Sequence, residues 1–184
     1  MLELIKLENT IKLDIRYARE DNVVGRPVYE EARAFLQPVA AKSLVRVHQK
    51  LREKNLGLII FDGYRPWSVT KLFWEVVRED QKKFVADPAK GSKHNRGCAV
   101  DLSMFDLNTG NIVEMPSDFD EFNEKASPDY IGGTDVEREN RDLLRRMMEL
   151  EDFIVNPKEW WHFDHKDWEK YEIFDIPFSE FGEK

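Results

Sequence analysis

The sequence predicts an α+β fold, with a central and largely antiparallel sheet against which several helices pack. Two segments alternate apolar and polar residues with the period of a half-buried strand, and three longer segments gather apolar residues on one helical face. No internal repeat, low-complexity tract or Pro/Gly/Ser-rich linker divides the chain. With 184 residues, 41% of them hydrophobic, the chain is long enough for one substantial core. Residues 1–184 are therefore predicted to form a single domain.

The first elements follow from local patterns in the first third of the chain. Residues 11–15 alternate apolar and polar side chains and predict a strand that runs toward Tyr17, with a loop over residues 18–37. Pro38 suits the first turn of a helix, and Gly57 is a candidate for the stop of that helix. The apolar residues 58–61 then predict a buried strand.

Two further helices have recognisable starts. Pro66, which closes a turn after the buried strand, can open a helix with one apolar face that ends near Lys83. Thr134 and Glu137 match a capping box, in which a threonine N-cap is followed three residues later by a glutamate. The apolar residues that follow them predict the third helix.

The remaining strands lie in the second half of the chain. Residues 98–105 alternate, and the turn-forming residues 107–111 with the apolar run 112–115 predict a hairpin. Residues 153–155 and 161–163 predict the last two strands, with an Asn-Pro-Lys break between them.

Charge and composition exclude several classes of partner. The chain has 28 basic and 36 acidic residues, a net charge of −8, which argues against nucleic acid and against anchoring to an anionic membrane. Residues 1–8 lack the basic start and apolar core of a secretory signal, and no run approaches the ~20 apolar residues that span a bilayer. Cys98 is the single cysteine, so no internal disulfide can form. A cytoplasmic location is expected.

His94, Asp101 and His162 are candidate ligands of one metal ion. His94 precedes Asp101 by seven residues with Gly97 between them, and strand alternation turns Asp101 toward the site and Cys98 toward the core. A hydrolytic zinc site has three protein ligands and an open position for water, whereas a structural zinc usually has four and favours cysteine. The pattern therefore favours catalytic zinc over the commoner role of a histidine that only pairs with a neighbour.

Glu159 is a candidate general base rather than a ligand. It lies three residues before His162, so in a straight strand the two side chains would point to opposite faces. Glu159 is therefore expected to precede the strand, with the turn at Pro157 swinging it over the metal.

The other polar and aromatic candidates are assigned structural roles. Strand alternation places His165 opposite His162, which predicts a surface position, and His48 lies in a helix without a functional role. Cys98 is assigned to the core rather than to nucleophilic chemistry. Core packing is also expected for Trp160 and Trp161, in preference to stacking on a substrate.

Arg65 lies on a turn directly after a buried strand, where a rigid scaffold commonly presents functional groups. It could stabilise the oxyanion of a tetrahedral intermediate or hold a substrate carboxylate. The alternative is a surface salt bridge.

Four motifs in order make the chain resemble the zinc D-alanyl-D-alanine dipeptidases, within the wider group of D-Ala-D-Ala and hedgehog-like metallopeptidases. They span nearly the whole chain: Asp14-Ile15-Arg16-Tyr17-Ala18 with Gly25-Arg26-Pro27, Asp62-Gly63-Tyr64-Arg65-Pro66, the Ser-x-His-x-x-Gly-x-Ala-x-Asp pattern over residues 92–101, and Glu159-Trp160-Trp161-His162. The resemblance implies a hedgehog/DD-peptidase-like fold, one zinc ion per chain at His94, Asp101 and His162, Glu159 as catalytic base and Arg65 as the arginine that stabilises the transition state.

The resemblance also implies a substrate, the dipeptide D-Ala-D-Ala, which would be hydrolysed to two D-alanines. It implies that Tyr17, Ser92 and Asp120 lie near the free amine of this dipeptide. Lys93 stands where some relatives have a small polar residue, at the edge of the implied pocket.

Two alternatives remain at this point. A relative with the same zinc ligands could be a D,D-carboxypeptidase or an L,D-endopeptidase on longer cell-wall peptides, although the block around Tyr17 and the acid Asp120 favour a closed site for a short substrate. A non-catalytic zinc-binding module is the other, and the presence of Glu159 and Arg65 argues against it, because binding alone needs no base beside the metal.

Overall fold

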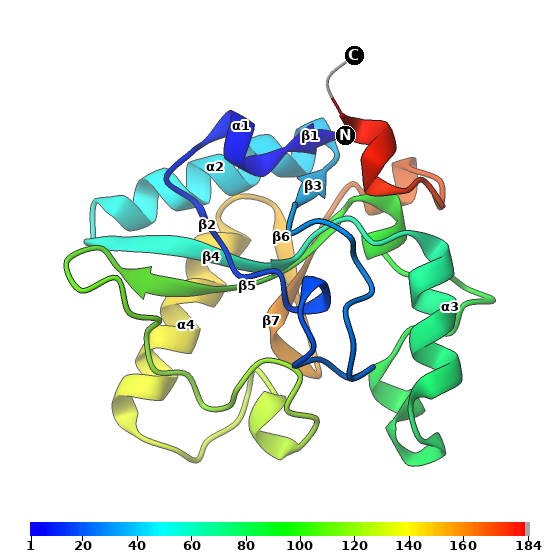
Figure 1. Cartoon of the computed structure of the whole chain (residues 1–184). Helices are drawn as coiled ribbons and strands as arrows, with labels where there is room; N and C mark the ends of the chain where they lie inside the picture. Colours follow the sequence, from blue (N-terminus) through cyan, green and yellow to red (C-terminus); the bar gives the residue numbers. More distant parts are fainter. Residues whose placement is uncertain (183–184) are drawn as a thin grey trace.

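A five-stranded sheet forms the centre of the computed structural model, which describes residues 1–182 (Figure 1). The strand order is β2-β4-β5-β7-β6; β2 runs parallel to β4 and the other pairs are antiparallel. The strands are β2 (Lys12–Leu13), β4 (Leu56–Asp62), β5 (Ala99–Asp106), β6 (Phe153–Asn156) and β7 (Glu159–His165). The predicted α+β fold with a largely antiparallel sheet is confirmed.

The helices cover one face of this sheet and one end of it. α2 (Pro38–Arg52) packs against β4, above it in the view, and α4 (Asp135–Glu149) packs against β6 and β7 (Figure 1). The two helices also contact each other. α3 (Trp67–Val76) stands apart from them at the right of the view. The N-terminal strand β1 (Leu2–Glu3) pairs with β3 (Phe35–Leu36), and the short helix α1 (Leu4–Leu7) follows β1.

A bulge in β4 brings an extra carboxylate to the face opposite α2 and α4. Leu58 and Ile60 point into the main core under the helices. The register then shifts between Ile60 and Asp62, so that Phe61 is an extra residue and Asp62 pairs with Asp101 of β5. The bulge therefore turns Asp62 to the same face as Asp101, which strict alternation would not do.

The end of α2 differs from the prediction. The helix ends at Arg52, and Asn55, with φ +61°, takes the left-handed conformation before β4 begins. Gly57 lies inside β4, where a Cβ atom would come within 2.5 Å of the Phe105 ring. This glycine permits close packing and does not stop the helix.

Other boundaries are shorter than the sequence patterns suggested. The strand predicted over residues 11–15 pairs only at Lys12–Leu13, and the predicted hairpin consists of an isolated bridge between Phe105 and Ile112. α3 ends at Val76, and a separate 3-10 helix covers Glu79–Phe84. The capping box at the start of α4 is confirmed, with both of its reciprocal hydrogen bonds present.

Candidate metal centre

Adjacent strands place three polar side chains in one row across the sheet. Asp101 of β5 pairs with Asp62 of β4 on one side and with His162 of β7 on the other. Asp101 is 3% exposed and His162 is 9% exposed, although both are polar. Burial of such a row is costly unless the side chains pair or bind an ion.

His94 joins this row from outside the sheet. It begins a 3-10 turn (His94–Arg96) that ends at Gly97, whose φ of +68° favours glycine. Its Nε2 lies 3.1 Å from Nδ1 of His162 and 3.4 Å from Oδ2 of Asp101. One ligand atom from each of the three residues lies within 4.8 Å of the others, as a single metal ion would require.

The hydrogen bonds behind the two imidazoles determine which nitrogens face each other. Nδ1 of His94 donates to the carbonyl of Gly63 at 2.7 Å, and Nε2 of His162 donates to Oδ1 of Asp164 at 2.9 Å. The lone pairs of Nε2 of His94 and Nδ1 of His162 therefore converge. Asp101 Oδ1 is buried and has no hydrogen-bond donor among the described residues 1–182, although it lies 3.0 Å from Nδ1 of His162. Two imidazole lone pairs and an unsatisfied carboxylate oxygen fit a divalent cation such as zinc.

The charges in the row also favour a cation. Burial would lower the pKa of His162, but the carboxylates of Asp164 and Asp101 outweigh burial and raise this pKa well above its ordinary value. Burial would raise the pKa of Asp101, yet the two histidines hold it well below its usual range. The centre therefore stabilises positive charge between these groups.

Glu159 lies beside the row with its carboxylate toward His162. Its Oε2 is 3.8 Å from Nδ1 of His162 and accepts a hydrogen bond from Nδ2 of Asn156 at 2.8 Å. Burial raises the pKa of Glu159 to about 7. A carboxylate with such a pKa is suited to accept and return a proton near neutral pH.

Glu159 does not precede the strand, contrary to the prediction, but is the first residue of β7. The register between β6 and β7 shifts: Val155 pairs with Phe163, whereas the next residue, Asn156, pairs with Glu159. The predicted turn is present at Pro157 and Lys158, directly before Glu159. The extra residues on β7 break the alternation, so Glu159 and His162 reach the same site although both belong to the strand.

Arg65 approaches the row from the turn after β4. Its Nε and Nη2 donate to Oδ2 of Asp62 at 3.0 and 2.8 Å, and Nη2 lies 3.7 Å from Oδ2 of Asp101. Tyr29 and the backbone N–H of Gly63 donate to the other oxygen of Asp62. Arg65 is buried at 8% exposure, so the surface salt bridge considered for it is wrong.

Another acid, half-buried, lies across the cavity. Asp120, whose φ of +60° is left-handed, accepts a hydrogen bond from the Tyr17 hydroxyl at 2.9 Å. Burial, with the charges of Asp101 and Glu159, raises the pKa of Asp120 to about 8. Ser92 lies in the same cavity wall, and its hydroxyl accepts the backbone N–H of His94 at 3.2 Å.

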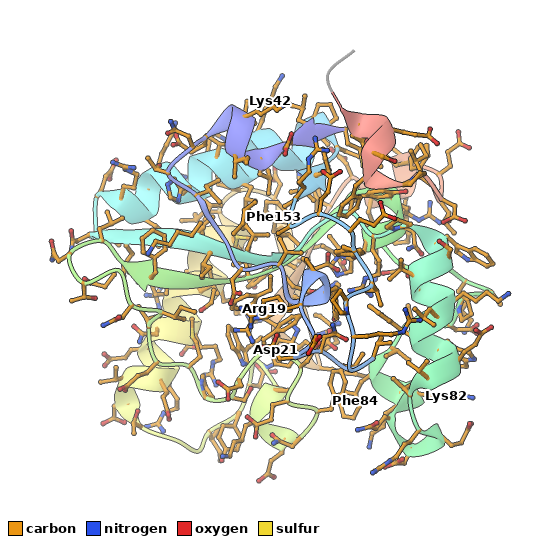
Figure 2. The ribbon with its side chains drawn as sticks, in the orientation of Figure 1. Arg19, Asp21, Lys42, Lys82, Phe84 and Phe153 are labelled. Carbon is orange, nitrogen blue, oxygen red and sulfur yellow. The ribbon has the colours of Figure 1, made fainter. Side chains whose placement is uncertain are left out.

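One cavity of about 270 Å³ is lined by all eight residues that the sequence analysis assigned to the metal, catalytic and substrate sites: Tyr17, Arg65, Ser92, His94, Asp101, Asp120, Glu159 and His162. Phe84 and Phe122 also line it, and their rings stack with centroids 4.9 Å apart. Phe84 ends the 3-10 helix Glu79–Phe84 and is labelled at the lower right of Figure 2. A cavity of this size is at the lower end for small-molecule sites.

The predictions for the remaining candidates had mixed outcomes. Cys98 is fully buried and burial raises its pKa to about 12, which confirms a core thiol. Trp160 and Trp161 are also buried, as expected, and Trp161 additionally lines the cavity. His165 was predicted at the surface and is fully buried, because the sheet face opposite His162 is covered by α2 rather than by solvent.

Three contributors to the site escaped the sequence analysis. Asp62 orients Arg65, Asn156 holds Glu159, and Asp164 orients His162. Asp62 directly precedes the Gly-Tyr-Arg-Pro turn, which was a usable signal. Asp164 follows His162 by two residues on β7, so strand alternation, which places both side chains on one face, was also a usable signal.

The site and comparisons with known proteins together define this protein as a metallopeptidase. The chain belongs to the peptidase M15 family, described as D-ala-D-ala dipeptidase, which it matches over residues 1–183.

Three relatives are each 30% identical to the chain. They are the D-alanyl-D-alanine dipeptidases of Escherichia coli K12, over 97% of this chain and 91% of that protein, of Enterococcus faecium, over 95% and 96%, and of Enterococcus faecalis V583, over 97% and 94%. Among the described residues, no helix combines the length and apolar character needed to cross a bilayer.

Proposed function

We propose that this protein is a zinc-dependent dipeptidase that hydrolyses D-alanyl-D-alanine to two molecules of D-alanine, with residues 1–184 as one catalytic domain. His94, Asp101 and His162 would hold one zinc ion per chain. The observation that carries the proposal is the convergence of two imidazole lone pairs and a buried carboxylate beside Glu159. The relatives named D-alanyl-D-alanine dipeptidase, which match this chain over almost their whole length, support it.

Glu159 is the proposed general base. When bound, the zinc ion would supply Lewis-acid polarisation of the scissile carbonyl and of a water molecule. Glu159 would take a proton from the attacking water and return it to the departing amine. The hydrogen bond from Asn156 and a pKa raised by burial to about 7 suit both transfers.

Arg65 is proposed to stabilise the oxyanion of the tetrahedral intermediate. Its guanidinium is held by two hydrogen bonds to Asp62 and lies 3.7 Å from Asp101, so its charge is fixed at the edge of the metal centre before substrate binds. A preorganised donor of this kind stabilises developing negative charge without having to reorient.

Asp120, Tyr17 and Ser92 are proposed to recognise the free amine of the dipeptide. Asp120 is the acidic group of this set, and it lies in the same cavity as the metal centre. An ammonium group bound there would form a charge-assisted hydrogen bond with the carboxylate. An acylated amine carries no charge and adds bulk to a cavity of about 270 Å³, so such a peptide should be refused.

The first test is to incubate zinc-loaded protein with D-Ala-D-Ala, with its L-containing stereoisomers and with N-acetyl-D-Ala-D-Ala, and to quantify free alanine. The proposal expects cleavage of the unblocked D,D dipeptide alone. Cleavage of the acetylated peptide would instead indicate a D,D-carboxypeptidase. Without cleavage of any of them, an L,D-endopeptidase or a non-catalytic zinc-binding module would replace the dipeptidase.

The cytoplasmic location is also proposed rather than established. It rests on the single cysteine, Cys98, which matches the low use of disulfides in a reducing compartment. Fractionation of the source cells with an antibody to the protein would test it.

A further inference from the structure

Lys93 and Asp164 form an ion pair that links the two segments bearing the histidines of the metal centre. Nζ of Lys93 lies 3.0 Å from Oδ2 of Asp164. Lys93 directly precedes His94, and Asp164 follows His162 by two residues on β7. The steps proposed above use neither residue, although Lys93 lines the same cavity.

The second oxygen of Asp164 determines which ring nitrogen of His162 carries the hydrogen. Oδ1 lies 2.9 Å from Nε2 of His162 and, as a carboxylate oxygen, it can only accept a hydrogen bond. The hydrogen of the neutral imidazole is therefore held on Nε2, and the lone pair of Nδ1 is left free for a metal.

The opposite tautomer has a competing acceptor on the other side of the ring. Oδ1 of Asp101 lies 3.0 Å from Nδ1 of His162 and would accept a hydrogen placed on that nitrogen. In this tautomer the lone pair of Nε2 would face the carboxylate of Asp164, which is electrostatically unfavourable. Asp164 thus excludes the arrangement in which His162 pairs with Asp101 and cannot bind a metal.

Lys93 anchors the Asp164 carboxylate in its place beside the imidazole of His162. Its backbone is fixed, because its carbonyl accepts the N–H groups of Arg96 and Cys98, each at 3.1 Å. Its ammonium lies 5.2 Å from the centre of the Trp168 ring, which shields one side of the ion pair. The Asp164 side chain is 14% exposed, so loss of Lys93 would remove one of the two partners that compensate its buried charge, the other being Nε2 of His162.

We propose that Lys93 and Asp164 are positioning residues that select the metal-binding tautomer of His162. The inference rests on the proposed zinc site at His94, Asp101 and His162. It assigns this ion pair to metal affinity and not to contact with the substrate.

The test is the zinc dissociation constant, measured by competition with a chromogenic chelator. Asp164→Ala removes the acceptor, and Asp164→Asn keeps the shape but lets an amide N–H support the wrong tautomer. Both should weaken zinc binding by about 10- to 100-fold, the usual cost of losing such a partner. Lys93→Met should weaken binding less, and Lys93→Arg should restore it, because the guanidinium retains the charge and the hydrogen bonds.

Matched controls separate this effect from loss of charge or of stability. Lys166→Met breaks the exposed pair with Asp152, and Asp129→Ala breaks the exposed pair with Arg145, so neither should change zinc affinity. Thermal unfolding without metal identifies any variant that merely folds poorly. If Asp164→Ala or Lys93→Met folds poorly, Asp164→Asn and Lys93→Arg still allow the test.

The outcomes separate this inference from the proposed function. A wild-type protein that binds no zinc would overturn both. Tight binding by the wild type that is unchanged in both Asp164 variants would overturn the inference alone. The inference is likewise wrong if Lys93→Arg binds zinc no better than Lys93→Met.

Discussion

The four histidines of this chain are all buried, but they form two contrasting pairs on opposite faces of the sheet. His48, on α2, and His165, which contacts α2 from β7, are each satisfied. One ring nitrogen accepts a backbone N–H at 3.1 or 3.2 Å, and the other contacts a hydroxyl at 2.9 or 3.4 Å. His94 and His162 instead direct one nitrogen each toward the other, 3.1 Å apart, beside a carboxylate. All four are at most 9% exposed.

Burial therefore does not separate the structural histidines of this protein from the proposed metal ligands, whereas complete hydrogen bonding does. A ring with both nitrogens satisfied stabilises the fold and has no capacity left for a ligand. A pair of rings whose lone pairs converge is unfavourable until a cation lies between them. Replacing one histidine of each pair by the same residue tests this distinction.

The largest effect is expected from His162→Gln compared with His165→Gln. Loss of His162 removes a proposed ligand, so zinc binding should be lost and kcat/KM should fall by at least about 10⁴-fold, because the metal and the function of Glu159 are disabled together. His165→Gln should retain zinc and activity but lower the free energy of unfolding by about 1–3 kcal/mol, through disturbed buried hydrogen bonds.

Zinc content, hydrolysis of D-Ala-D-Ala and urea unfolding of the two variants check this prediction. The contrast between the pairs would be wrong if His165→Gln lost zinc while remaining folded, or if His162→Gln kept its zinc.

The next largest effect is expected from Glu159→Gln, which changes the proposed base beside His162 without removing a proposed metal ligand. The amide cannot accept the proton of the attacking water, so kcat should fall by about 10²- to 10⁴-fold. Zinc content should remain that of the wild type, because three ligands are retained. Substantial activity in a zinc-loaded variant would contradict the assignment of Glu159 as base.

A smaller effect is expected from Asp120→Asn, which tests recognition of the amine. Asparagine tolerates the left-handed φ of +60° at this position, so the backbone should be preserved. Loss of a charge-assisted hydrogen bond should raise KM for D-Ala-D-Ala by about 10- to 100-fold with a smaller change in kcat. Asp118→Asn, an exposed acid two residues away, serves as the control, and an unchanged KM in Asp120→Asn would remove Asp120 from the substrate site.

The fold was largely predictable because its elements have local causes. The capping box at Thr134, the proline before α3 and the alternation in β5 each act within a few residues, and each was recovered. The errors have tertiary causes. Gly57 was predicted to stop a helix, whereas in the structure it packs against the Phe105 ring of the neighbouring strand β5. A contact between paired strands is invisible in a local sequence pattern.

The composition of the site was predictable in the same way, and its geometry was not. Strand alternation turned Asp101 to the correct face, since β5 is regular there. It failed for Glu159, where the β6–β7 register shifts, and could not foresee that α2 covers His165. The supporting acid Asp62 depends on a bulge in β4, so its place in the site appears only in the folded chain, whereas alternation within β7 was sufficient to place Asp164 on the face of His162.

The smallest expected effect concerns the structural pair and its dependence on pH. Burial lowers the pKa of His48, so over the range below about pH 6.5 the unfolded chain binds a proton that the folded chain does not. Stability should therefore fall as the pH decreases from about 7, with a slope of up to about 1.4 kcal/mol per pH unit from this residue, and should level off below the folded-state pKa. His48→Gln, in which the side chain can still accept a hydrogen bond, should show a smaller slope.

Urea unfolding of the zinc-saturated proteins between pH 5 and 8 measures this difference. His165, whose pKa is also lowered by burial, contributes a slope of the same sign to both proteins, so a part of the dependence should survive in His48→Gln. Acids with lowered pKa, such as Glu3 beside Arg33, lose their contribution only at lower pH and do not interfere. The linked effect of zinc is common to both proteins and cancels in the comparison. Parallel curves for the two proteins would mean that His48 is not kept neutral by burial, and the distinction between satisfied and converging histidines would then rest on His165 alone.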